Sequence, residues 1–382
     1  MGQGSTQTRS AAGTHRRRAA HLLLALLAAG AASPARPTTP PTPRFVPVLA
    51  TIQGGDTLFW QRLPENPAPR ELARLRHEPG FLPRAAVSPD GRRLAYTWLP
   101  EGSRDDGPSA RLDLLDLTSG AGAQFAAEVD LRAVPLWSTD GSAVLFRRTY
   151  RREDTPSRVE LHASVIGHPG GTQAVLVEKA NTLVPLLWSA DGAVLYGRWG
   201  TGVDLRRAEP GAAAPYTVAH LSDGPAHNLN LSPDGQTVAF TRPLGPGAPG
   251  QHGLFLVSIA TGAVAQRWTE ANDSLNPVWQ PGVQALTFAT RGPFGALASL
   301  PQAAGLFSGP PQTIHARQDG RLEVPLAWSP DGRWLMVRSL QGANAYSITG
   351  EELVLVEAAS GSREAINRPG YTAFIGWRAW AE

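Results

Sequence analysis

The sequence predicts an all-β protein: a single β-propeller, most simply with seven blades of four antiparallel strands. A short phrase returns along the chain and is best preserved at residues 328–337, Trp-Ser-Pro-Asp-Gly-Arg-Trp-Leu-Met-Val. The residues that open successive copies, here called anchors, lie 43 to 51 positions apart, at 87, 137, 188, 231, 279, 328 and 377. A period of about 50 residues with turn-rich, β-biased content is typical of propeller blades rather than of helical solenoids.

Each copy predicts two strands joined by a tight turn. Proline presets φ, aspartate caps turn amides and glycine accepts a positive φ, so Pro-Asp-Gly is a hairpin signal. Apolar residues seven and nine places after an anchor, such as Val238 and Phe240, predict one buried strand face. Related turns stand at 87–91, 137–141, 188–192, 231–235 and 328–332, with a degenerate copy at 279–282.

The aspartates of these turns are interpreted as structural. A catalytic or calcium-binding role is not expected, because five equivalent carboxylates on separate blades cannot converge on one site. The residues concerned are Asp90, Asp140, Asp191, Asp234 and Asp331. The tryptophans that recur at the anchors are likewise expected to pack between blades.

The two ends of the chain are predicted to share one blade. The copy around Trp377 offers only an innermost strand, 371–380, while the segment 45–75 offers outer strands without an anchor. Joining them gives seven blades and leaves no open edge in the ring, which a propeller needs because unpaired strand edges invite aggregation. The propeller is therefore expected over residues 45–382, with six blades as the alternative if the end segments pair differently.

Residues 1–32 have the pattern of a signal peptide. Three arginines, Arg16 to Arg18, precede a short apolar run that ends in small residues. The run is too short to span a bilayer comfortably, and a Pro/Thr-rich stretch at 33–44 predicts an extended linker. We expect an exported protein, periplasmic or extracellular, with no stable membrane insertion after cleavage.

The charge and the cysteine content exclude several function classes. Four arginines and no acid lie within residues 1–32, so their removal takes the formal net charge from +3 to −1. A nearly balanced mature chain has no electrostatic footprint for nucleic acid. The chain has no cysteine, which excludes disulfides, a thiol nucleophile, a thiolate metal site and a lipidated cysteine.

The repeated phrase Trp-Ser-Pro-Asp-Gly-x-x-Leu, with a proline before the anchor as in Pro277-Val278-Trp279, resembles the TolB-type β-propeller repeat. This repeat is related in shape to WD-repeat propellers and is similar to repeats in prolyl-oligopeptidase-like enzymes. The resemblance covers essentially all of the chain after the leader. It implies the propeller fold but no single activity, because the family includes periplasmic interaction scaffolds as well as propellers fused to hydrolases.

Motifs that would indicate an enzyme are missing from the sequence. It contains no Gly-x-Ser-x-Gly, no His-Glu-x-x-His and no Walker-type phosphate loop, and its one Gly-x-Gly-x-x-Gly match, at 245–250, is interrupted by two prolines. His220, Asp223 and His227 are close in sequence, but they flank an ordinary inter-blade loop, so no metal site is predicted. No catalytic residue and no cofactor are predicted.

The sequence therefore favours a non-enzymatic protein-interaction or ligand-binding module of the cell envelope, whose partner is a protein or a small ligand and not a nucleic acid. The alternative is a hydrolase- or lyase-type propeller enzyme with its site in the central channel. Polar residues three to five places before the anchors are expected to rim that channel and to bind the partner. They are Arg84, Arg132, His227, Asn228, Asn276 and Glu323.

A hydrated channel mouth without a ligand is the competing interpretation of this rim. Two long Gly/Pro-rich loops, 100–108 and 243–253, are the other candidates for a contact surface. Arg147-Arg148 and the run 151–154 add a charged patch, which we interpret as a solvated hairpin.

Overall fold

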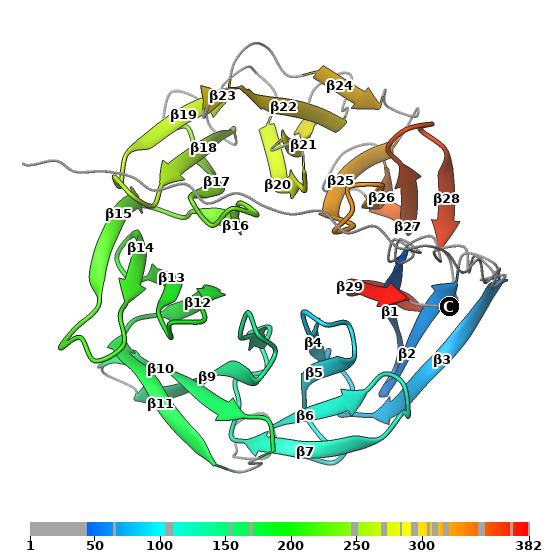
Figure 1. Ribbon diagram of the computed structural model, residues 1–382, viewed down its shortest axis with the longest axis horizontal. Coiled ribbons are helices and arrows are strands. Elements are labelled where there is room, and N and C mark those ends of the chain that lie inside the picture. Colours follow the sequence, from blue (N-terminus) through cyan, green and yellow to red (C-terminus); the bar gives the residue numbers. More distant parts are fainter. Residues whose placement is uncertain are drawn as a thin grey trace, which may run out of the picture. The chain divides into compact units, whose positions relative to one another are not determined.

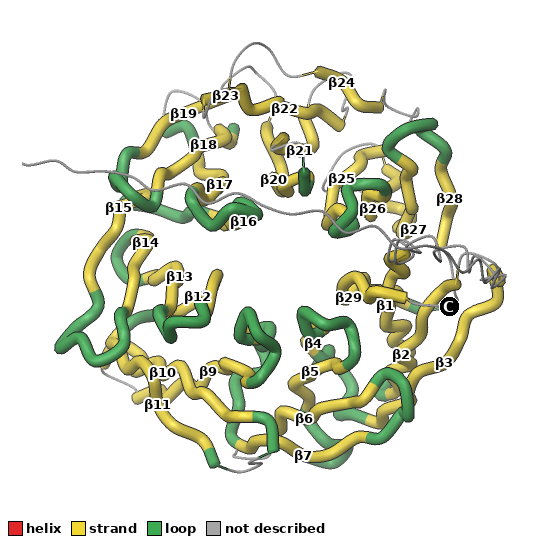
Figure 2. The backbone as a smooth tube through the Cα atoms, viewed as in Figure 1, coloured by secondary structure: helices red, strands yellow, loops and turns green. Residues whose placement is uncertain are grey.

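The computed structural model describes residues 44–382 apart from short stretches. The stretches left out are 64–65, 104–109, 153–154, 168–170, 246–250, 269–272, 283–284, 292–296, 304–305, 308–311, 316–320, 343–347, 367–369 and 381–382. The predicted signal peptide, nearly all of the predicted linker and parts of both predicted contact loops lie outside the described residues. In the part that is described, Figure 2 shows only strands and loops, and no helix there has the length and apolarity to cross a membrane.

The described chain forms seven antiparallel sheets (Figure 1), which we call blades 1 to 6 and the closing blade. Blade 1 comprises β4 (Arg84–Val87), β5 (Arg93–Trp98), β6 (Arg111–Asp116) and β7 (Gly122–Ala127). Blade 2 comprises β8 (Leu136–Trp137), β9 (Ala143–Arg152), β10 (Thr155–Val165) and β11 (Thr172–Lys179). Blade 3 comprises β12 (Thr182–Trp188), β13 (Val194–Trp199), β14 (Val203–Ala208) and β15 (Tyr216–Ser222).

The remaining blades follow in chain order. Blade 4 comprises β16 (His227–Leu231), β17 (Thr237–Pro243), β18 (His252–Ser258) and β19 (Val264–Trp268). Blade 5 comprises β20 (Asp273–Gln280), β21 (Ala285–Arg291), β22 (Leu297–Ala303), β23 (Leu306–Phe307) and β24 (Gln312–His315). Blade 6 comprises β25 (Arg321–Trp328), β26 (Trp334–Gly342), β27 (Ile348–Glu357) and β28 (Arg363–Ile366). The closing blade comprises β29 (Tyr371–Trp380), β1 (Arg44–Gln53), β2 (Asp56–Leu63) and β3 (Asn66–Arg76).

The all-β propeller prediction is confirmed. In Figure 1, strands such as β12 and β16 lie nearest the centre of the ring and strands such as β7 and β11 lie at its periphery. Six of the seven sheets have the regular four-stranded form. Blade 5 departs from it, because β22 pairs with both β23 and β24. The ring therefore has six regular blades and a seventh, five-stranded sheet.

The predicted closure is also confirmed. The C-terminal strand β29 pairs with β1 from Arg44 opposite Trp380 to Ile52 opposite Tyr371, with one register shift at Val48/Leu49. Because β2 and β3 continue outward from β1, the two ends of the propeller complete one blade. The C-terminal strand and the N-terminal strands thus form one four-stranded sheet, and the ring is not left open between them.

The repeated turns fold as their sequence predicts. In the last copy, the Ser329 hydroxyl donates to Asp331, while the backbone amide of Trp334 donates to Ser329 Oγ at 2.9 Å. Gly332 has a φ of 68°, which favours glycine. Each of the five turn aspartates accepts both from the serine two places before it and from a backbone amide two places after it. Their structural role is confirmed.

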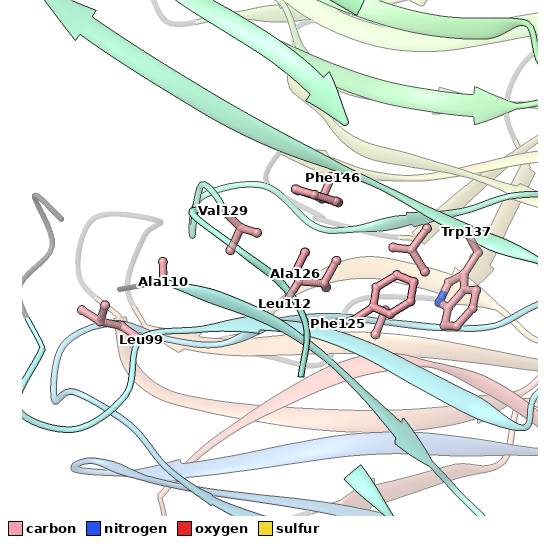
Figure 3. Packing of buried hydrophobic residues seen from close by; sticks show 10 residues of the cluster. Leu99, Ala110, Leu112, Phe125, Ala126, Val129, Trp137 and Phe146 are labelled. Atoms are coloured by element: carbon pink, nitrogen blue, oxygen red, sulfur yellow. The ribbon is translucent and has the colours of Figure 1, made fainter. Parts of the chain in front are cut away.

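The core lies between the blades. Between blades 1 and 2, the side chains of Leu112, Phe125 and Phe146 gather with Trp137, as Figure 3 shows. Three of the anchor tryptophans also carry a polar link to the preceding blade: Trp137 Nε1 donates to the carbonyl of Ala86 at 2.9 Å, Trp279 Nε1 to the carbonyl of Asn230 at 3.0 Å, and Trp328 Nε1 to the hydroxyl of Thr287 at 3.1 Å. Since a buried indole N–H needs an acceptor, the anchor fixes both the packing and the orientation of neighbouring blades.

Candidate binding face

One end of the ring gathers the starts of the inner strands. Because a blade has an even number of antiparallel strands across its width, the chain leaves the outer strand and enters the next inner strand at the same end. We call this the rim end and the opposite end, which carries the anchor turns, the turn end. Neighbouring inner strands such as β4 and β8 contact one another, so side chains at their starts are placed side by side around the centre.

The predicted rim residues differ in exposure. Arg84 at the start of β4 and Arg132 before β8 are exposed, as are His227 and Asn228 at the start of β16. Arg84 has no hydrogen-bond or ion-pair partner for its guanidinium among the described residues. These four side chains are accessible to a partner.

Glu323, in contrast to these four residues, is buried. Its side chain is only 2% exposed, and its Oε2 accepts from Arg363 Nη1 at 3.0 Å. This ion pair joins β25 to β28 within blade 6, and the carboxylate is covered by protein. The spacing that placed Glu323 on the rim identifies its strand position but not the direction of its side chain.

Asn276 and Asn228 both shape the backbone of their inner strands. They stand three places before their anchors and have φ values of 51° and 55°, in the left-handed region that asparagine tolerates better than most residues. Each of them lies within a register shift of its inner strand. The Asn276 amide donates to the carbonyl of Pro325 on the next blade, and the Asn228 amide donates to Thr241 Oγ1 at 3.3 Å. These bonds hold the bulge that turns the chain into the inner strand.

A buried charge cluster underlies the rim beside Arg132. Asp130 Oδ2 accepts from Arg147 Nε at 3.1 Å and from the Thr149 hydroxyl at 2.7 Å, while Arg132 binds Asp130 through its backbone amide and its side chain. Arg147 also donates to the Leu183 carbonyl of blade 3 at 3.0 Å. Burial alone would raise the pKa of Asp130, but the bonds from Arg132 and the charge of Arg147 outweigh it and lower that pKa to about 2.

This cluster corrects one interpretation of the sequence. Arg147 was expected in a solvated charged patch, yet it is 6% exposed and joins blades 2 and 3. The side chains of 151–154 lie outside the described residues. The signal that would have identified the cluster is the alternation of strand β9, which places Arg147 and Leu145 on the same strand face.

His220 forms a separate polar contact on blade 3. Its Nδ1 lies 2.8 Å from Asp204 Oδ1 and its Nε2 lies 3.1 Å from Asp223 Oδ1. The hydrogen bond and charge of Asp204 raise the pKa of His220. Both ring nitrogens are thus engaged, and within the described residues no three histidine, aspartate or glutamate side chains group as metal ligands.

Apolar side chains are exposed near Arg84 and Arg132 at the rim end. Four of them stand at or just before the inner strands of four successive blades, a set we call the apolar arc. Its members are Tyr371 of the closing blade, 38% exposed, Leu82 before β4, 39%, Val134 before β8, 51%, and Val184 of β12, 37%. Single exposed apolar residues are normal on a protein, and others are exposed elsewhere on this one, but their recurrence near the starts of four successive inner strands makes this end a candidate contact surface.

Comparisons with known proteins bear on the fold. No protein-family model and no curated protein matches the chain. Among solved structures, it is similar to TolB from Acinetobacter baumannii at 18% identity and a TM-score of 0.46, covering 69% of this chain and 62% of that one. It is similar to the β-propeller domain of the Trilobed protease from Pyrococcus furiosus at 10% identity and a TM-score of 0.54, covering 86% of this chain and 97% of that one.

A puromycin-hydrolyzing peptidase from Mycobacterium tuberculosis is similar at 14% identity and a TM-score of 0.56, with 85% of this chain and 53% of that chain covered. The chain thus spans about half the length of that peptidase and less than two thirds of the TolB chain. At these identities, the matches with TM-scores above 0.5 show the propeller fold and no activity.

Proposed function

We propose that the protein is an exported, non-enzymatic interaction module of the cell envelope, and that its rim end binds a protein partner. The observation that carries the proposal is the apolar arc beside the exposed guanidiniums of Arg84 and Arg132. Aromatic residues and arginine are enriched where proteins contact one another. Export rests on the leader pattern of residues 1–32.

The side chains of the apolar arc and of Arg84 indicate which groups the partner's surface should present. Burying a half-exposed valine, leucine or tyrosine contributes roughly 1 kcal/mol, so the arc supplies affinity only as a group. A guanidinium binds a carboxylate with two parallel hydrogen bonds, so the exposed Arg84 is suited to a carboxylate on the partner. The partner is therefore expected to present an apolar segment with an adjacent acidic side chain or chain terminus.

Two carboxylates at the rim, Asp130 and Glu323, give the enzyme alternative no support. Asp130 and Glu323 are both buried and paired with arginines, Arg147 and Arg363. A general acid or base needs a proton that it can exchange with a substrate near the working pH, whereas the pKa of Asp130 is about 2. These groups hold the scaffold on which the contact face stands.

The test is affinity capture with the propeller as bait, from the envelope and medium of the native host. A rim variant carries Leu82→Asp, Arg84→Ala and Val134→Asp. The matched control carries Val264→Asp, Arg92→Ala and Val165→Asp, three changes of exposed side chains at the turn end with the same change in charge. One partner retained by the wild type and the control but lost from the rim variant supports the proposal. Equal retention by all three baits, or a bound small molecule in place of a protein, overturns it.

A further inference from the structure

The outer edge of blade 2 is open. Among the strands that the structure describes, β11 pairs only with β10, and it lies at the periphery of the ring (Figure 1). Proteins usually protect such an edge by making it short or by placing prolines and charges on it. Strand β11 spans eight residues without a proline, and its one exposed charge, Lys179, stands at its last position. The edge is therefore available for pairing with another strand.

Two valines are exposed on this edge strand. Val175 is 41% exposed and Val177 is 48% exposed. Val175 stands at the register shift between β10 and β11, where it is the extra residue and has no counterpart in β10. Among the described side chains of the other outer strands, Tyr216 of β15 and Val264 of β19 are the only large apolar ones with comparable exposure. Strand β11 thus combines an open backbone edge with the most exposed apolar surface of any described outer strand.

The side chains between these valines and beyond them hold β11 in place. Leu176 is 6% exposed and belongs to the hydrophobic cluster between blades 2 and 3. Glu178 accepts from Arg206 Nη1 of blade 3 at 2.7 Å and from the Tyr196 hydroxyl of the same blade at 2.5 Å. Because the strand is already fixed in its extended form, little ordering cost remains when a second strand pairs with it.

The sequence of β11 is suited to pairing with a second copy of itself. In an antiparallel pair with a twofold axis at Leu176, Val175 of each copy stands opposite Val177 of the other. Apolar β-branched residues directly opposite one another stabilise antiparallel strands. Lys179 of each copy falls opposite the uncharged Gln173 of the other, so the two lysines stand at opposite ends of the pair, roughly 20 Å apart along the strands. No like charges meet in this register.

We propose that β11 is the interface of a symmetric dimer, in which two copies of this chain join their blades 2 by antiparallel pairing of their β11 strands. Two strand edges and four valines make a small contact compared with the roughly 800 Å² per partner that a stable interface buries. The dimer is therefore expected to be reversible, with a dissociation constant in the micromolar range. Because the paired strands run in opposite directions, the rim ends of the two copies open to opposite sides and both stay accessible to the partner proposed above.

The first measurement is sedimentation velocity of the full chain over a range of protein concentrations that spans the micromolar region. Val175→Glu places a carboxylate where the second copy presents Val177, so pairing would bury an unpaired charge. We expect this variant to weaken self-association at least tenfold. The matched control is Val264→Glu, the same substitution of an exposed valine on the outer strand of blade 4, which should associate as the wild type does.

The second measurement is amine-specific cross-linking, which localises the contact. Lys179 is the one lysine of the chain, so a link between two Lys179 side chains can only join two copies. A long cross-linker should give this product from the wild type and from Val264→Glu, identified by mass spectrometry, and much less of it from Val175→Glu. Lys179→Arg keeps the charge and removes the amine, so it should still dimerise but give no such product.

The inference is overturned if the full chain sediments as a monomer at every concentration, or if Val175→Glu associates as the wild type does. A dimer that gives no Lys179–Lys179 product, or one that Val264→Glu weakens equally, would place the contact elsewhere and overturn it as well. The rim variant used for affinity capture should dimerise as the wild type does. The dimer and the proposed function therefore fail separately.

Discussion

The buried carboxylate of Asp130 provides the sharpest test of how the rim is held. Asp130→Asn keeps the size of the side chain and removes its charge beside Arg147. The pKa of Asp130 is about 2 against an ordinary value of 3.8. A difference of about 1.8 in pKa corresponds to about 2.4 kcal/mol of folding free energy, and leaving the Arg147 charge buried without its partner can raise the cost to about 4 kcal/mol.

The sign of the pH dependence follows from the lowered pKa. The native state favours the ionised carboxylate, so the contribution of Asp130 is fully present above the unfolded pKa of 3.8 and is lost as the pH falls through the folded value of about 2. We therefore expect Asp130→Asn to lower the free energy of unfolding by about 2–4 kcal/mol at pH 7. The deficit should shrink progressively as the pH is lowered from about 5 to 2.

The assay is urea unfolding at several pH values, with Asp223→Asn as the control because that side chain is fully exposed. The control should change the free energy of unfolding by no more than about 0.5 kcal/mol. An Asp130→Asn protein as stable as the wild type at pH 7 would refute the reasoning. A deficit that does not change with pH would show that shape, not charge, determines the stability.

Three further changes test the packing and the turns. Asp113 is buried with one oxygen lacking a hydrogen-bond partner, and burial raises its pKa. Its contribution to the free energy of unfolding therefore falls as the pH rises above the unfolded pKa of 3.8. Asp113→Asn should raise the free energy of unfolding at pH 7 by about 1 kcal/mol, with no gain below pH 3.8, as measured by urea titration. Trp328→Phe removes the indole bond to Thr287 Oγ1 and part of the packing, and should cost about 2 kcal/mol in the same assay; an unchanged midpoint would mean that the bond is dispensable. Gly332→Ala places a Cβ 3.0 Å from the Pro281 carbonyl at a φ of 68° and should cost about 1–2 kcal/mol, whereas Gly211→Ala, at a φ of 74° with no atom near, should cost only the backbone term of about 1 kcal/mol.

The fold was predictable from the sequence because the repeated phrase is local. Ser329, Asp331 and Gly332 act within a few positions of one another, so their letters determine the turn. The closure of the ring was predictable because an anchor without outer strands and outer strands without an anchor complement each other. Blade 5 was not predictable in detail, since the division of its outer edge into β23 and β24 has no counterpart in the other copies.

The candidate site was predictable only in part. The position of Arg84 and Arg132 at the rim follows from their spacing to the anchors. The buried Glu323 is paired with Arg363, forty positions away in the chain, and the buried Arg147 donates to the carbonyl of Leu183 on the next blade. Such contacts depend on which blades become neighbours and on the direction of each side chain, and a local pattern contains neither.

The most direct test of the rim end as the contact face is site-specific photo-cross-linking in the native host. A benzophenone amino acid replaces Val134 at the rim end or Val165 at the turn end, which are 51% and 49% exposed. We predict a discrete cross-linked product with one protein from position 134 and none from position 165. The same product from both positions, or from position 165 alone, would contradict the assignment of the contact face.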